Sequence, residues 1–321
     1  DMVLRSTSNG ARLIPGSFES SYTRPTTRFH SSHSIPENAR PADSVALRLE
    51  HPHWPLAIML ILTQLAAGVH AVQGVMLSRQ FAAPYLAISI AGFVALVGGM
   101  IVSFTHLGRP LKAWRAFLGL RRSWMSREIA AFSAYAGAAS GLLLFPTFAP
   151  LVWGTIALGM ISVACSAMIY IDTHRPFWAA SRTVPKFFGT AALLGATTSA
   201  ALFGWTAPAL APASAIAATI IRTVLFGWEW AVFIPSLRNP KSPAHRSALV
   251  LARLLRPILV GRVILFVAST IFSVLAIFNA DGLGAIWGTI AFLTTTASQL
   301  LERHTYFTAS AAPRMPGGVP A

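Results

Sequence analysis

Apolar runs of about 17–24 residues recur from Trp54 onward, and they constrain the fold of this chain more than any other sequence feature. A helix rises about 1.5 Å per residue, so each run is long enough to cross roughly 30 Å of hydrocarbon. Strands of a membrane barrel would instead alternate apolar and polar residues over about ten positions. We therefore predict an all-α integral membrane protein, a bundle of eight transmembrane helices. The predicted spans are residues 56–77, 85–105, 128–145, 151–171, 187–205, 212–234, 261–279 and 283–301.

The composition agrees with a membrane protein. Of 321 residues, 54% are hydrophobic and 11% are charged, which falls outside the range of soluble proteins. A net charge of +15 would favour nucleic-acid binding if the basic residues formed one compact domain. They lie between apolar runs instead, so we expect membrane lipid or a partner protein as the binding partner, and no nucleic acid.

Three regions follow from these changes in composition. Residues 1–53 are rich in Ser, Thr, Pro and Arg and predict an extended polar arm, which is either a disordered tail or a segment that packs along a partner subunit. Residues 54–305 form the membrane anchor, and residues 306–321 form a C-terminal tail. The first 55 residues lack a secretory signal. Because the chain begins with Asp, it is expected to be either a processed product or the later part of a longer polypeptide.

The connections between spans differ sharply in charge. Residues 78–84, 146–150, 206–211 and 280–282 are short and contain one basic residue, Arg79, whereas 22 of the 25 Lys and Arg residues lie in the arm, the tail and the other connections. By the positive-inside rule, the basic loops and both termini are expected to be cytoplasmic. The expected location is a bacterial inner membrane. In the alternative, the basic loops face an acidic partner or anionic lipid on the outer side.

The sequence argues against redox metals within this chain. Cys165 is the single cysteine, so the chain cannot ligate an iron–sulfur cluster through cysteines. A bis-histidine haem needs two histidines at matching depth, and His70 is the one clear mid-span histidine. We expect no haem, no cluster and no metal site.

Residues 103–129 carry the strongest candidate site. His106 ends the second span and Glu128 begins the third, so two titratable groups share one membrane depth. A quinone headgroup needs such an arrangement, with hydrogen-bond donors and a proton-exchanging group beside an apolar slot. Between the two residues, apolar side chains at helical spacing predict a short helix in the membrane interface: Leu111, Trp114, Phe117 and Leu118. In the alternative interpretation, this helix serves anchoring alone.

Polar residues inside other spans are weaker candidates. Arg222 and Glu229 are seven residues apart on the sixth span, and we expect a buried ion pair or a packing contact, with a proton path as the alternative. Gln64 on the first span is explained equally well by hydrogen bonding between helices. Arg262 and Arg303 lie near the basic ends of their spans, where extension toward lipid headgroups competes with a functional role.

Several motifs in order resemble the DmsC-type anchor subunits of the dimethyl sulfoxide reductase family of molybdopterin oxidoreductases. The first is HLGRP followed by RSWMSREI, within residues 103–129. The others are HWPLAIMLILTQLAAG at 53–68, MIYIDTHRPFW at 168–178, LVGRVILF at 259–266 and LERHTYFTASAAPRMPG at 301–317. The resemblance maps the quinol-site His and Glu of the family onto His106 and Glu128, and it adds support for the candidates Arg109, Arg262, Arg303 and Tyr170.

The resemblance implies an anchor that binds a four-cluster-type iron–sulfur subunit, which in turn binds a molybdopterin catalytic subunit. Electrons would pass between these subunits and membrane quinone or quinol, menaquinone among them, as in anaerobic respiration. In members that face the periplasm, the HLGRP end lies outside the cell, whereas the charge count here favours the cytoplasm. Two alternatives stay open, a polytopic transporter and a purely structural anchor without a quinone site. The arm, at GSFESSYTRPTTRF, resembles the join between fused iron–sulfur and anchor portions.

Overall fold

The computed structural model describes residues 47–105, 114, 117, 119–279 and 282–310, together with the backbone of four short strands. Most of the predicted polar arm lies outside the described residues. Within it, strands β1 (Met2–Val3) and β2 (Arg28–Phe29) pair antiparallel. Strand β3 (Arg40–Pro41) pairs antiparallel with β4 (Pro316–Gly318), so a segment of the arm is hydrogen-bonded to a segment of the tail.

The described chain between these strands is helical. Eight of its helices have 18 residues or more: α1 (Trp54–Ser78), α2 (Tyr85–Phe104), α3 (Trp124–Gly141), α4 (Ala149–Ile171), α5 (Ala180–Thr206), α6 (Ala211–Arg238), α8 (Arg256–Phe278) and α9 (Gly282–Thr308). Three shorter helices join them: η3 (Pro176–Trp178), η4 (Pro208–Leu210) and α7 (His245–Arg253).

Six segments within the described ranges are long and apolar enough to cross a membrane, namely α1, α2, α4, α5, the stretch that joins η4 to α6, and α8. Helices α3 and α9 fall short of that standard because of their composition. Helix α3 begins with a charged first turn and continues in Ala, Ser and Gly, and α9 carries many Thr residues together with Glu302 and Arg303. The prediction of an all-helical membrane protein is confirmed, and the crossing by α3 and α9 stays a prediction.

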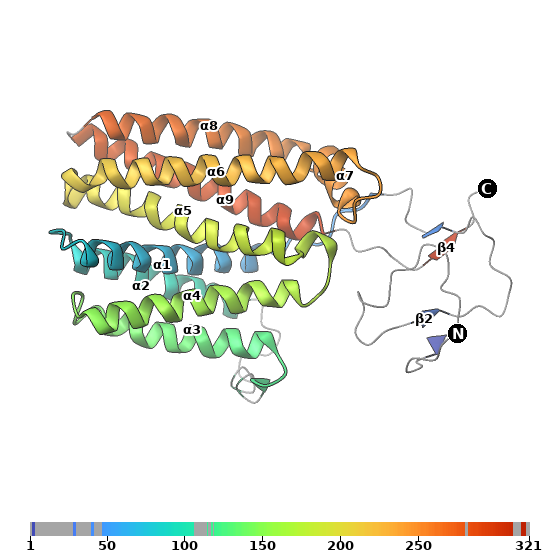
Figure 1. Ribbon diagram of the computed structural model, residues 1–321, viewed down its shortest axis with the longest axis horizontal. Helices are drawn as coiled ribbons and strands as arrows, with labels where there is room; N and C mark the ends of the chain where they lie inside the picture. Colours follow the sequence, from blue (N-terminus) through green and yellow to red (C-terminus); the bar gives the residue numbers. More distant parts are fainter. Residues whose placement is uncertain are drawn as a thin grey trace.

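The long helices run side by side as one bundle (Figure 1). Helix α1 packs against α2, α4, α5 and α9, while α8 packs on α9 and α6. Helices α1 and α5 come closest where two glycines face each other. A Cβ on Gly195 would stand 2.3 Å from the backbone carbon of Gly68, so neither position has room for a side chain. Close contact between helices through small residues is typical of helix packing in lipid.

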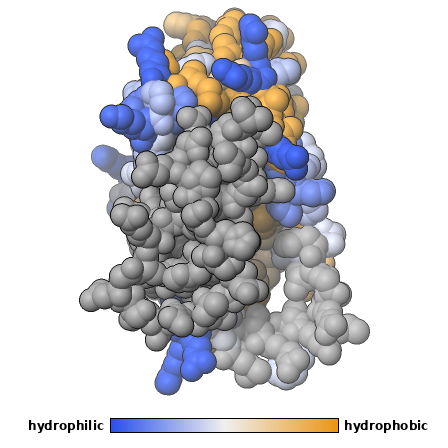
Figure 2. Space-filling model, turned by 90° about the vertical axis from the view of Figure 1, so that its right-hand side faces the viewer, coloured by the Kyte–Doolittle hydropathy of each residue, from blue (hydrophilic) through white to orange (hydrophobic). Residues whose placement is uncertain are grey.

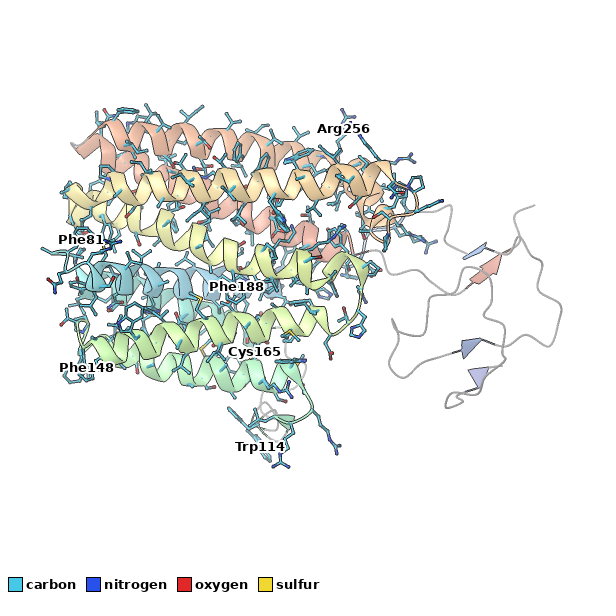
Figure 3. The ribbon with its side chains drawn as sticks, viewed as in Figure 1. Phe81, Trp114, Phe148, Cys165, Phe188 and Arg256 are labelled. Carbon is cyan, nitrogen blue, oxygen red and sulfur yellow. The ribbon has the colours of Figure 1, made fainter. Side chains whose placement is uncertain are left out.

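The two ends of the bundle match the two classes of connection. Phe81 and Phe148, in the short connections, lie at one end, and Arg256, beside the basic connection after α6, lies toward the other (Figure 3). We call the latter the basic end. Seen from there, hydrophilic side chains lie along the rim, and in the upper part they alternate with hydrophobic ones (Figure 2).

Helix α7 lies in the connection between the sixth and seventh predicted spans. Helix α6 continues to Arg238, α8 begins at Arg256, and α7 forms between them. Its buried residues Ser247, Ala248, Val250 and Leu251 fall on one face at helical spacing, which explains why a short segment is helical when it can pack on the bundle.

Candidate functional site

Glu128 lies in the second turn of α3 at the basic end. Ser123 caps this helix by accepting a hydrogen bond from the backbone nitrogen of Ser126 at 3.4 Å. The Glu128 side chain is buried and accepts a hydrogen bond from the hydroxyl of Ser166 on α4. The neighbouring Arg127 points elsewhere, with its guanidinium 4.2 Å from the ring centre of Trp124. Helix α3 therefore delivers a carboxyl group to the interior of the bundle.

The predicted partners of Glu128 lie outside the described residues. This applies to His106 and Arg109, and to Leu111 and Leu118 of the predicted interfacial helix. Of that segment, Trp114 and Phe117 are described and are exposed, as anchoring in an interface requires. The pairing of His106 with Glu128 therefore stays a prediction.

Arg303 is completely buried near the basic end, so its side chain does not extend toward lipid headgroups. Its guanidinium donates hydrogen bonds to Gln64 on α1 at 2.9 Å and to Thr190 on α5 at 3.3 Å. It also lies over the ring of Phe187, 4.4 Å from the ring centre. The structure thus joins Gln64 and Arg303, two residues that the sequence analysis proposed separately, through contacts that fix α9 against α1 and α5.

Arg303 belongs to a larger group, which we call the ion cluster: Lys186, Glu229, Arg262, Glu302 and Arg303. Lys186 on α5 bridges two carboxylates, with Glu229 at 3.3 Å and Glu302 closer. Arg262 on α8 donates to the other oxygen of Glu229 at 2.7 Å. Buried charges are costly unless they are paired, and here each cation contacts a carboxylate. Four helices thereby meet through charge pairs at one depth.

Sequence reasoning missed Lys186 and Glu302 as members of this cluster. The predicted fifth span begins at residue 187, which places Lys186 in a basic loop, whereas α5 begins at Ala180 and includes it. Glu302 falls in a motif of the family resemblance at the end of the last span. The signal that could have found both is opposite charges at equal depth on neighbouring spans, since such charges need partners in hydrocarbon.

Of the alternatives expected for Arg222 and Glu229, an ion pair between the two residues is not formed. Arg222 donates to the carbonyl oxygen of Ser269 at 3.0 Å and to the hydroxyls of Ser273 and Thr295, at 3.1 Å and 2.9 Å. Glu229 pairs with Lys186 and Arg262 instead. Seven residues put the two groups on nearly one face of α6 but about 10 Å apart along its axis, so they lie at different depths.

Tyr170 occupies an aromatic cluster beside the ion cluster. Its ring lies 5.3–5.7 Å, between ring centres, from four neighbours: Trp178, Phe187, Tyr306 and Phe307. Two hydrogen bonds fix the arrangement, from the indole of Trp178 to the carbonyl of Tyr306 and between the hydroxyls of Thr183 and Tyr306, both at 2.9 Å. The cluster joins α4, η3, α5 and α9 at the basic end.

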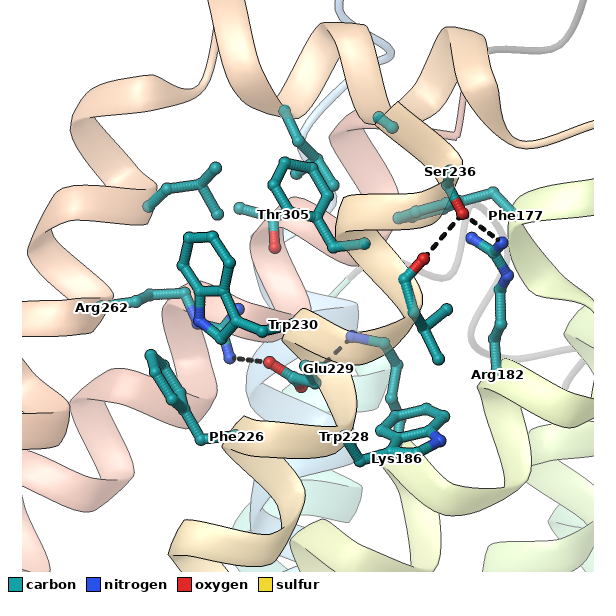
Figure 4. A pocket seen from close by; sticks show the side chains of 15 residues that line it. Phe177, Arg182, Lys186, Phe226, Trp228, Glu229, Trp230, Ser236, Arg262 and Thr305 are labelled. Carbon is teal, nitrogen blue, oxygen red and sulfur yellow. Dashed lines mark hydrogen bonds and ion pairs between the residues drawn. The ribbon is translucent and has the colours of Figure 1, made fainter. Parts of the chain in front are cut away.

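A cavity opens against the ion cluster between α5, α6, α7 and α8 (Figure 4). We call it the α6 cavity. Counting its open mouth, the space between its side chains is about 740 Å³. Aromatic side chains of α6 line one wall, and Lys186, Glu229 and Arg262 form its floor. Figure 4 shows Arg262 and Lys186 reaching Glu229 from opposite sides.

Groups of three or more His, Cys, Asp or Glu side chains that could hold a metal ion do not occur among the described residues. His70 accepts or donates a 2.6 Å hydrogen bond with the hydroxyl of Tyr135 inside the bundle, and Cys165 is buried and free. The expected absence of haem and iron–sulfur clusters stays a prediction.

The family comparison decides the class of protein. The model of the DMSO reductase anchor subunit family (DmsC) matches residues 49–308, which include every long helix described above. The chain belongs to the DmsC family. Its apolar helices and this family together support a multi-pass membrane anchor of an oxidoreductase.

A curated relative is consistent with membership in DmsC. This relative, a sulfite dehydrogenase subunit from Allochromatium vinosum, is 49% identical over 41 residues. The match covers 13% of this DmsC-family chain and 13% of the relative, so it concerns one local segment of each.

Proposed function

We propose that this DmsC-family chain anchors an iron–sulfur subunit of a molybdopterin oxidoreductase and exchanges electrons between that subunit and membrane quinone. The family supports the anchor role. The observation that carries the quinone role is Glu128, a buried carboxyl group at the basic end, whose described partner is a neutral hydroxyl on α4. A quinone that gains or loses two electrons also gains or loses two protons, so its site needs such a proton-exchanging group.

In this proposal all eight long helices span the membrane. Helix α3 has 18 residues and would extend about 27 Å, close to the thickness of the hydrocarbon core. Helix α9 has 27 residues, and its charged residues are buried in the ion cluster rather than turned toward lipid. With an even number of spans, the start of α1 and the end of α9 lie on the same side of the membrane, which is the side of the basic end.

The quinone headgroup would bind between His106 and Glu128. A histidine titrates near neutral pH and can exchange a proton with a quinone oxygen, while a carboxyl group at a helix start can hold the imidazole or relay the proton to water. Arg262, Arg303, Tyr170 and Gln64 are supporting residues in this proposal, and they act by positioning helices at the basic end rather than by touching the ring. Arg109 is a further supporting candidate, and it lies outside the described residues.

The basic end would face the cytoplasm of a bacterial cell and carry the iron–sulfur subunit. Its excess of Lys and Arg supports this side by the positive-inside rule. The name of the sulfite dehydrogenase relative makes sulfite a first substrate to assay with the assembled complex.

Co-purification from the native membrane tests the proposal. The tagged chain should bring down an iron–sulfur protein and molybdenum in stoichiometric amounts, and the complex should reduce or oxidise a short-chain quinone. A chain that purifies without either partner, and transports a solute when reconstituted in vesicles, would be a transporter. A complex that contains both partners but shows no quinone-linked electron transfer would be a structural anchor.

A further inference from the structure

One wall of the α6 cavity consists of aromatic side chains of α6. Phe226, Trp230 and Phe233 repeat at intervals of four and three residues, so they share one face of α6 and form an aromatic wall. Their rings touch in sequence, with centres 6.0 Å and 5.5 Å apart. The first pair of rings is tilted by 57° and the second stands at 85°, so a planar ring in the cavity can stack on one of them and meet another edge to face.

The floor of the cavity is polar. Lys186 and Arg262 both pair with Glu229, and Lys186 also pairs with Glu302. The side chains of Lys186 and Glu229 are each 16% exposed, so a ligand in the cavity can contact them. Arg182 also lines the cavity and donates a hydrogen bond to the hydroxyl of Ser236 at 2.9 Å. A neutral headgroup with carbonyl or hydroxyl oxygens needs donors and an acceptor, which the floor offers.

The surroundings of the cavity suit an amphipathic molecule. Helix α7 covers it at the basic end through Ala248 and Leu251, which line its roof. Toward the membrane, the residues next to the lining are apolar and exposed: Ile234, Val260 and Val263. An apolar tail could therefore lie along α6 and α8 in lipid while its headgroup occupies the cavity.

We infer that the α6 cavity is a binding site for the ring of a membrane quinone or quinol, distinct from the proposed site at Glu128. The ring would stack on Trp230 and Phe233, and its oxygens would contact Lys186 and Glu229. The two sites lie on different sides of the bundle, since α3 is at the opposite edge from α6 and α8 in Figure 1. This inference rests on the proposed function, because it requires that quinone is the redox partner.

Photolabelling of the full complex in its native membrane tests this site. The probes are azido derivatives of a short-chain naphthoquinone and a short-chain benzoquinone, used with and without excess unlabelled quinone. We expect labelling that the competitor removes, on peptides from residues 226–236 or 248–262. In the variant Ala248→Phe, a ring fills the roof, and labelling there should fall about tenfold. Arg253→Phe, at an exposed position on another face of α7, is the control and should label normally.

The outcomes separate this inference from the proposed function. Competed labelling confined to residues 103–130 would overturn the α6 site and leave the quinone role intact. Labelling of α6 that Ala248→Phe does not reduce, or that excess quinone does not compete, would also overturn the α6 site, because a lipid or a surface would then be the target. If no competed labelling occurred anywhere on the chain, the proposed function would fail as well.

Because Ala248→Phe could disturb folding, the variant counts only if the iron–sulfur subunit still co-purifies. Otherwise Trp230→Leu takes its place, with Trp287→Leu at the other end of the bundle as its control.

Discussion

Arg262 on α8 donates a hydrogen bond to Glu229 on α6 at 2.7 Å, and the two groups form an ion pair that is largely buried. Lys186 reaches the same carboxylate from α5. The pair therefore connects three helices at the depth where the α6 cavity ends. Within a bundle whose other contacts are largely apolar, this pair is expected to fix how α6 and α8 meet, because a shift of either helix would separate the charges.

Replacing one partner of this pair should destabilise the chain more than replacing both. Arg262→Met leaves Glu229 with Lys186 alone, and breaking a buried pair costs about 3–5 kcal/mol. The double variant Arg262→Met with Glu229→Met removes both charges and should recover most of that loss, as a double-mutant cycle measures. Thermal unfolding in detergent is the measurement. Equal or greater loss in the double variant would show that the pair does not act as a unit.

Two glycines offer a matched pair of substitutions. Gly195→Ala would put a Cβ 2.3 Å from the backbone of Gly68, so α1 and α5 must separate, and we expect a loss of about 1–3 kcal/mol or more. Gly137→Ala meets nothing within 4 Å and should be neutral or stabilising by up to about 1 kcal/mol, because alanine favours helix. Unfolding in detergent compares the two. Similar effects at both positions would contradict the close helix contact.

Replacing His106 by Ala should abolish quinone-linked turnover of the complex. Turnover with a soluble artificial electron carrier should persist, because the substitution leaves the other subunits intact. Glu128→Gln should lower the quinone-linked rate by about 10²–10⁴-fold, the range typical of a lost acid–base group. Arg79→Gln, at the other end of the bundle, is the control. Normal quinone-linked rates in both variants would exclude the Glu128 site.

Single introduced cysteines can determine on which side of the membrane the basic end lies. Cys165 is buried, so it gives little background. Lys241→Cys lies in the basic connection before α7, and Ala82→Cys lies in the short connection between α1 and α2; both positions are exposed. In intact cells, an impermeant thiol reagent should label Ala82→Cys and leave Lys241→Cys unlabelled. The reverse pattern would put the basic end outside the cytoplasm.

Purified alone, the chain should show neither a haem absorbance band nor bound iron. One cysteine and a single clear mid-span histidine cannot supply the ligands of a cluster or a bis-histidine haem. Optical spectra of the oxidised and reduced protein and metal analysis give the answer. A reduced-minus-oxidised haem band that belongs to the isolated chain would contradict the expectation.

The sequence by itself determined the positions of the long helices and the family, because an apolar run that must satisfy its backbone in lipid has to form a helix of nearly fixed length. It also predicted buried partners for Arg222 and Glu229 and hydrogen bonding between helices as one explanation of Gln64. Only the tertiary structure decided which partners those are, since a helical pattern gives the face of a side chain but not the neighbouring helix. Arg222 donates to neutral oxygens, and Glu229 pairs with Lys186 and Arg262. Arg303 donates to Gln64, which lies 239 positions away in the sequence. Helix α7 and the α6 cavity could not be predicted for the same reason, because α7 packs on α6 and α8 and the cavity is lined by helices that are distant in sequence.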